Sequence, residues 1–244
     1  MTTSLSNQNE SESQAGDTNV RWGLGDAIAG LSLTLVVPAI VGAAAIALAG
    51  LKPDDEIPLW GVALLQIPLW VGLLGAPLWA SYRKGNSSLS KDFGLSMQLR
   101  DIPIGLGVGL SAQISLGIML QAIYRFFNVD TDQVGQTAKE LTDQASGPVG
   151  VVLLILVVVV AAPILEELFY RGLWLKAIEA RLGTAWAVVL SSVLFGAIHF
   201  QLYDFPALAT IGLLAAILTV KFKRLGPAIW LHVAFNLTAV IALL

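Results

Sequence analysis

The feature that most constrains this chain is a series of long apolar blocks separated by short polar breaks. A helix that crosses the hydrocarbon core of a bilayer needs about 20 predominantly apolar residues. Seven blocks approach or exceed this length, and they cover residues 27–51, 57–81, 102–124, 149–175, 184–200, 206–222 and 226–243. The pattern predicts an all-α fold, a polytopic transmembrane helical bundle with seven or eight membrane helices.

Composition excludes several other classes of protein. Hydrophobic residues make up 56% of the 244 residues and charged residues only 13%, whereas soluble domains carry about 25% charged residues. The net charge of −3 and the lack of a long basic run argue against a nucleic-acid partner. Cysteine is absent, which excludes disulfides, thiolate metal sites and a cysteine nucleophile. Any chemistry must therefore come from oxygen and nitrogen groups.

The chain divides into a short tail and one large domain. Residues 1–20 hold no Lys, no Arg and no apolar block, so they predict a disordered polar tail rather than a secretory signal. Residues 21–244 form a single transmembrane domain. Within it, the charged stretch 172–182 either continues the fourth block or forms a separate interfacial helix, which would be the eighth.

Basic residues predict the orientation, because Lys and Arg in short loops favour the cytoplasmic side. A cytoplasmic N-terminus places 11 of the 14 basic residues on that side. They are Arg21, Arg83, Lys84, Lys91, Arg100, Arg171, Lys176, Arg181, Lys221, Lys223 and Arg224. Only Lys52, Arg125 and Lys139 fall outside. We expect an integral protein of a prokaryotic cell membrane, with the bilayer as its first partner.

Three glycines in the third block, Gly105, Gly107 and Gly109, predict close packing against another helix. Small residues at four-residue spacing let helix backbones approach each other in lipid.

Ionisable side chains inside a membrane helix cost about 2.5 to 3.5 kcal/mol each on insertion scales, so each needs a reason. Here they gather in the C-terminal half, and both histidines of the chain are among them. The set comprises Glu166, Glu167, His199, His232 and, beside the last, Asn236.

The sequence Glu-Glu-Leu-Phe-Tyr-Arg contains the first group. Glu167 and Arg171 are four residues apart on a helix and face each other, so they are expected to form an ion pair. Glu166 is rotated by about 100° from this pair and is left free to act as a general base. Pro163 cannot donate a backbone hydrogen bond, which predicts a kink or an inlet for water just before the glutamates.

The other two groups share the four-residue spacing: Phe195 with His199, and His232 with Asn236. Each group alone has an ordinary explanation, as a charge cluster at a helix end, a packed histidine or a hydrogen bond between helices. Together they place rare polar groups on three helices of one half of the chain, which favours a single hydrolytic site.

These three motifs, Glu-Glu-x-x-x-Arg, Phe-x-x-x-His and His-x-x-x-Asn, make residues 149–240 resemble the CAAX protease and bacteriocin-processing family of intramembrane proteases, also called the CPBP or Abi family. The resemblance implies a membrane endopeptidase that cuts a membrane-associated protein or peptide near the cytoplasmic side. Eukaryotic members remove the last three residues of prenylated proteins, and some prokaryotic members are linked with bacteriocin maturation or self-immunity.

Two mechanisms remain open at this stage. In the first, no cofactor takes part: Glu166 is the general base, His199 helps to hold the attacking water, and His232 and Asn236 donate hydrogen bonds to the oxyanion. In the second, Glu166, His199 and His232 ligate one divalent metal of the zinc type, which activates the water. The Asn236 amide beside His232 favours the first. In both, Glu167 and Arg171 orient the catalytic groups.

Two other functions are considered besides the protease. One is a non-catalytic membrane scaffold or bacteriocin-immunity partner of the same fold; the other, a small transporter, is disfavoured because no inverted repeat is evident. The helix boundaries also contain a conflict. At 1.5 Å per residue, His199 would lie about 22 Å from the cytoplasmic face and His232 about 9 Å. We therefore expect one boundary between residues 172 and 206 to be wrong.

Overall fold

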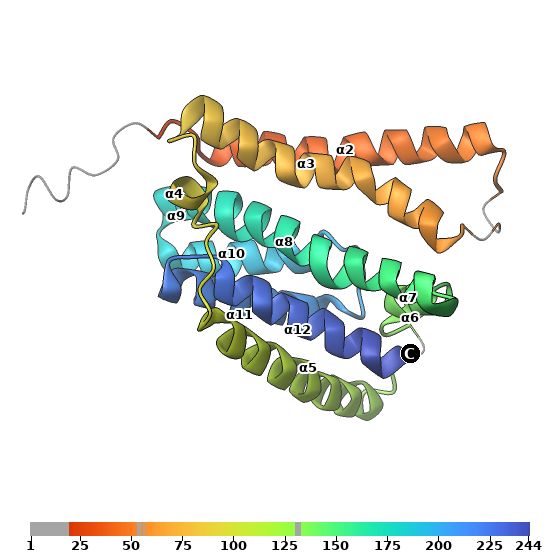
Figure 1. Ribbon diagram of the computed structural model, residues 1–244. Coiled ribbons are helices and arrows are strands. Elements are labelled where there is room, and N and C mark those ends of the chain that lie inside the picture. The colour runs from red at the N-terminus through yellow and green to blue at the C-terminus, as the bar shows by residue number, and fades with distance from the viewer. Residues whose placement is uncertain (1–19, 53–54, 56, 130–132) are drawn as a thin grey trace, which may run out of the picture.

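The computed structural model describes residues 20–52, 55, 57–129 and 133–244, and this part of the chain is helical without a strand (Figure 1). Six of its helices are long and apolar enough to cross a membrane, and one shorter apolar helix, Thr184–Ala197, accompanies them. Each of the seven apolar blocks is thus helical, and the predicted polytopic bundle is confirmed. The tail expected over residues 1–20 lies, apart from Val20, outside the described residues.

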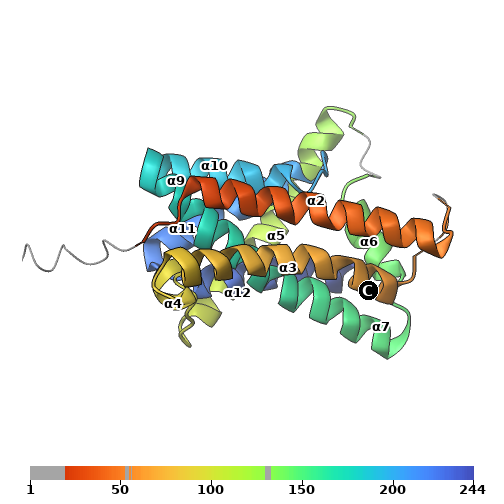
Figure 2. The ribbon, with the colours of Figure 1, turned by 90° about the horizontal axis from the view of Figure 1, so that it is seen from above.

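The first half of the chain supplies two long antiparallel helices and the elements that follow them. Helices α2 and α3 run side by side along one flank of the bundle (Figure 1 and Figure 2). The bounds are α2 (Leu24–Ala49), α3 (Leu59–Lys84), α4 (Leu89–Phe93), α5 (Asp101–Phe126) and α6 (Gln136–Asp143).

The fourth block forms one continuous helix of 36 residues, Gly147–Leu182, in which two stretches are π-helical. Its segments are α7 (Gly147–Leu154), the π-helical η1 (Ile155–Ala161), α8 (Ala162–Glu167), the π-helical η2 (Leu168–Trp174) and α9 (Leu175–Leu182). The alternative of a separate interfacial helix over 172–182 is wrong. Pro163, the second residue of α8, lies just after η1 and has no N–H to continue the ordinary ladder of helix hydrogen bonds. Such π segments occur often at functional sites.

The last three helices are α10 (Thr184–Ala197), α11 (Phe205–Phe222) and α12 (Gly226–Leu243). Helix α10 ends at Ala197, whereas the sequence predicted helix through residue 200, and Phe200 has a left-handed φ of 55°. The expected boundary error therefore lies here. His199 is a turn residue between two helices that pack on each other, not part of a full membrane crossing.

Helix α12 lies in the interior and packs closely on α5. Gly105 and Gly109 make this possible, because an added Cβ on either would collide with the backbone of Pro227 or Leu231. Gly107 faces open space instead. The packing expected of these glycines is thus confirmed for two and wrong for the third.

Hydrogen bonds and an ion pair hold together the end of the bundle where α3 ends and α9 lies. The carboxylate of Asp92 on α4 accepts hydrogen bonds from Ser81 and Asn86, while Lys176 of α9 donates to its backbone carbonyl at 2.7 Å. Burial acts to raise the pKa of Asp92, but these hydrogen bonds outweigh it and lower the pKa. A buried ion pair between Arg224 and Asp101 joins the start of α5 to the loop before α12.

Candidate active site

The ion pair expected within the first motif is present and fully buried. Nη1 of Arg171 lies 3.1 Å from Oε1 of Glu167, and both side chains are 0% exposed. The guanidinium also lies over the Phe195 ring, 4.2 Å from its centroid. Arg171 is therefore a charge in the interior of the bundle.

His232 connects the first motif to the third, because its imidazole lies beside both glutamates. Its Nδ1 is 2.9 Å from Oε1 of Glu167, and its Nε2 is 3.9 Å from Oε2 of Glu166. A carboxylate can only accept, so Nδ1 carries the proton of the shorter contact. Glu167 thus holds both Arg171 and His232, and it directs Nε2 of the imidazole towards Glu166.

Glu166 takes no part in the Glu167–Arg171 ion pair. Its Oε2 is buried and, among the described residues, has no hydrogen-bond partner. The 3.9 Å separation from His232 Nε2 is too long for a direct hydrogen bond and suits a shared water. Oε2 of Glu167 and all three guanidinium nitrogens of Arg171 also lack hydrogen-bond partners in the described part of the chain. Such a group of unsatisfied polar atoms demands an explanation, such as water or substrate.

His199 contacts the same phenyl ring as His232. Its Nδ1 is 2.6 Å from the carbonyl oxygen of Phe195, which leaves Nε2 as the free nitrogen. The Phe195 ring contacts the His199 ring at 4.8 Å and the His232 ring at 5.6 Å, centroid to centroid. The Phe195 ring thus contacts both imidazoles, and within the described residues no hydrogen bond joins His199 to the glutamates.

Asn236 lies one helical turn beyond His232, but it is not a free amide. Its Nδ2 donates to the carbonyl oxygen of Val158 at 2.8 Å. Val158 belongs to η1, where the π-helical pattern changes the usual backbone pairing. One N–H of the Asn236 amide is thus used to tie α12 to the long helix, and the other is left for further contacts.

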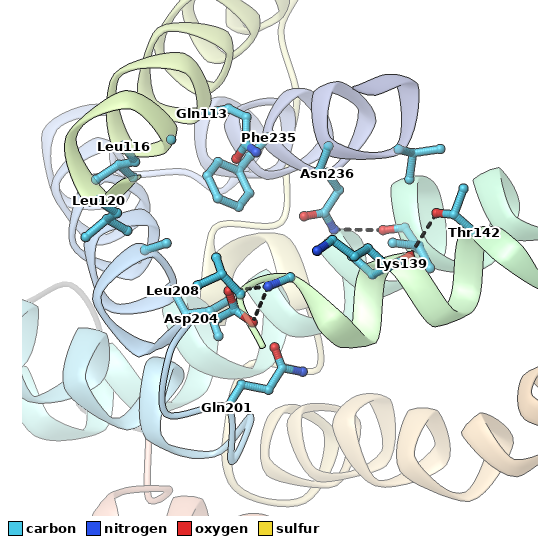
Figure 3. A pocket seen from close by; sticks show the side chains of 18 of the residues that line it. Gln113, Leu116, Leu120, Lys139, Thr142, Gln201, Asp204, Leu208, Phe235 and Asn236 are labelled. Carbon is cyan, nitrogen blue, oxygen red and sulfur yellow. Dashed lines mark hydrogen bonds between the residues drawn. The ribbon is translucent and has the colours of Figure 1, made fainter. Parts of the chain in front are cut away.

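Asn236 also borders a cavity of about 690 Å³ that the three motifs do not predict (Figure 3). Its walls come from α5, α6, the long helix, α11 and α12, and from Gln201 and Asp204 in the turn that follows His199. Polar residues in α5, Gln113 and Gln121, were the only signal for it in the sequence. The cavity therefore touches all three segments that carry the motifs, although Asn236 is the one motif residue in its lining.

The turn after His199 holds α6 against this cavity. The Asp204 carboxylate accepts the backbone N–H of Gly135 at 3.0 and 3.2 Å, and the Tyr124 hydroxyl donates to the Tyr203 carbonyl at 2.6 Å. Burial raises the pKa of Asp204, against the opposing effects of the Gly135 hydrogen bond and the Lys139 charge.

The metal-ligand set considered from the sequence does not assemble in this arrangement. No three His, Cys, Asp or Glu side chains within the described ranges lie close enough to hold one ion. Glu166 and His232 approach each other, but no hydrogen bond or ion pair in the described ranges joins His199 to either. The three groups thus do not fit a metal as they stand.

Comparison with known proteins supports the resemblance read from the motifs. Residues 148–238 match the family described as "Type II CAAX prenyl endopeptidase Rce1-like". Over 89 residues the chain is 32% identical to a protein of Bacillus subtilis (strain 168) named "Putative membrane peptidase YdiL". This stretch is 36% of the present chain and 36% of that relative, so the match spans about a third of each. No solved structure matches the chain.

Proposed function

We propose that this integral membrane protein, whose residues 148–238 match the Rce1-like family, is an intramembrane endopeptidase that hydrolyses a membrane-associated protein or peptide. The observation that carries the proposal is the position of His232 between two carboxylates, 2.9 Å from Glu167 and 3.9 Å from Glu166. One carboxylate orients the imidazole while the other stays free to take a proton. This division of tasks suits water-mediated hydrolysis.

The proposed reaction needs no cofactor. A water held by Glu166, with help from Nε2 of His199, loses a proton to the Glu166 carboxylate and attacks the peptide carbonyl carbon. The oxyanion of the tetrahedral intermediate accepts hydrogen bonds from His232, in its protonated form, and from the second N–H of Asn236. The carbon–nitrogen bond then breaks, and Glu166 returns the proton to the leaving nitrogen.

Glu167 and Arg171 act in this proposal by positioning. The carboxylate of Glu167 fixes the ring orientation of His232, and Arg171 keeps that carboxylate in place. A lone carboxylate in this interior would be costly, and the guanidinium compensates it.

The cavity beside Asn236 is proposed as the place where the substrate segment lies. It adjoins the Asn236 amide and the turn that carries His199, and it offers both apolar walls and amide side chains. The distribution of Lys and Arg supports a cytoplasmic N-terminus. A prokaryotic cell membrane remains the expected location.

The proposal is tested by comparing new peptide termini in membranes that contain wild type or Glu166→Gln, measured by mass spectrometry of enriched termini. Glu166→Gln should abolish the cleavages that wild type produces. Glu179→Gln, a similar replacement on the same long helix, should leave them intact. A farnesylated peptide with a C-terminal CAAX sequence serves as a defined second substrate. Cleavage that survives in Glu166→Gln contradicts the assigned base.

Metal dependence is tested separately on a preparation that shows activity. Full activity in protein shown by elemental analysis to be metal-free supports the water-only mechanism. Activity that disappears on chelation and returns in proportion to added Zn²⁺ would contradict it.

The scaffold alternative is favoured by one observation: His232, His199 and Asn236 each hydrogen-bond within the protein, as structural polar groups do. The unpartnered Oε2 of Glu166 speaks against it. Two results together would support the scaffold. Membranes with wild type and with Glu166→Gln would contain the same peptide termini, and the purified Glu166→Gln protein would be unfolded, which would make Glu166 a structural residue.

A further inference from the structure

Helices α2 and α3, on the flank away from the α5–α12 contact (Figure 1), enclose an apolar groove of about 480 Å³. Its floor forms where Gly30 and Gly72 bring the helices together, since an added Cβ would meet Ala76 from the first and Thr34 from the second. Gly75 lies in the same groove, and an added Cβ there would meet nothing within 4 Å. The missing side chain at residue 75 therefore leaves the groove open.

A hollow lined by cations adjoins one end of this groove. Arg21, Trp79, Arg83 and Lys84 line it, and Trp79 borders the groove as well. These residues lie just before α2 begins and in the last turns of α3, where a membrane-spanning helix meets the headgroup region. Tryptophan and basic residues are the side chains typical of that depth.

Within the described residues, one of the three cations is neutralised by a nearby acid. Lys84 Nζ lies 2.6 Å from Asp26, whose second oxygen accepts the Gly23 N–H. Arg21 and Arg83 are exposed, and no ion pair joins either to a carboxylate in the described part of the chain. The hollow thus presents two guanidinium groups beside an apolar groove.

We propose that this surface binds one anionic glycerophospholipid. Arg21 and Arg83 hold the phosphate, because a guanidinium matches phosphate oxygens in a bidentate manner. The Trp79 ring lies at the level of the glycerol, and an acyl chain fills the groove beside Gly75. An anionic lipid complements the two free charges, whereas a zwitterionic lipid brings its own cation to a site that is already positive.

The test uses the full chain in detergent and measures bound lipid by native mass spectrometry. The probes are phosphatidylglycerol and phosphatidylcholine with identical acyl chains. We expect one tightly bound phosphatidylglycerol, held at least about five-fold more tightly than phosphatidylcholine. Arg21→Gln and Arg83→Gln should each weaken phosphatidylglycerol binding about five-fold, the effect of one basic group near an anionic headgroup, and reduce the preference between the lipids. Gly75→Leu should weaken both lipids, because its side chain occupies the groove.

Two matched variants serve as controls. Lys221→Gln removes an exposed charge from the last turn of α11, and Gly107→Leu adds the same side chain at another open helix glycine. Neither should change binding. Equal affinity for the two lipids, or losses in the controls as large as in the Arg21, Arg83 and Gly75 variants, would overturn the proposal. Gel filtration checks whether each variant is folded. Because Arg21 and Arg83 are exposed, their variants test the site even if Gly75→Leu does not fold.

Discussion

Replacing Arg171 by Met should destabilise the protein strongly, because the substitution leaves the Glu167 carboxylate uncompensated in the interior. The two groups lie 3.1 Å apart with both side chains 0% exposed. At an effective dielectric constant of about 20, their attraction is about 5 kcal/mol. Removing one partner of a buried pair costs about 3 to 5 kcal/mol in measured cases. The lost contact with the Phe195 ring acts in the same direction.

The free energy of unfolding is measured in mixed micelles by circular dichroism as the mole fraction of dodecyl sulfate rises. Lys84→Met is the matched control: its partner is Asp26, but the lysine side chain is 35% exposed, so the loss should be about 0 to 1 kcal/mol. The double variant Glu167→Gln with Arg171→Met should be more stable than Arg171→Met alone, because no buried charge is left unpaired. A loss below about 1 kcal/mol for Arg171→Met, or strictly additive effects in the double variant, would refute the reasoning.

Three further predictions use the same unfolding measurement. Gly109→Ala should lower stability by about 1 to 3 kcal/mol, because its Cβ collides with the Leu231 carbonyl, whereas Gly107→Ala should raise it by about 0.5 to 1 kcal/mol. Asn236→Leu should cost about 1 to 3 kcal/mol by leaving the Val158 carbonyl unpaired, and unchanged stability would contradict that bond. Burial raises the pKa of Asp204, so the folded state holds this proton more tightly than the unfolded state does. Stability should therefore fall as pH rises from the ordinary value of 3.8 through the raised value, and Asp204→Asn should lose this dependence.

The length of the apolar blocks predicted the fold well, because the backbone N–H and C=O groups of a segment within lipid must form their hydrogen bonds inside that segment. All seven blocks became helices, and the long fourth block exceeded its predicted end because charged residues such as Lys176 find partners at the end of the bundle. The end of α10 was wrong for a physical reason. The apolar block runs on to residue 200, and its pattern does not reveal the turn between two packed helices that begins after Ala197.

The candidate site was predictable only where its contacts lie within one helix. The spacing of four residues sufficed for Glu167 and Arg171. The bond from Asn236 to Val158 joins residues 78 positions apart, and the contact of the Phe195 ring with both histidines depends on how α10 and α12 pack. Such contacts follow from packing, which residue spacing does not encode.

The two π-helical segments on either side of α8 make the length of this helix as important as its residues. A π segment pairs each carbonyl with the fifth residue along the chain and so holds one residue more per turn than an α-helix. Deleting one residue within Ile155–Ala161 would keep all three motifs, the hydropathy and the family resemblance. The shortened stretch could close into ordinary α-helix and lose the irregular backbone pairing around the Val158 carbonyl, to which Asn236 of α12 donates. A homologue one residue shorter in this segment can therefore retain every recognisable motif and still lack this tie between α12 and the long helix.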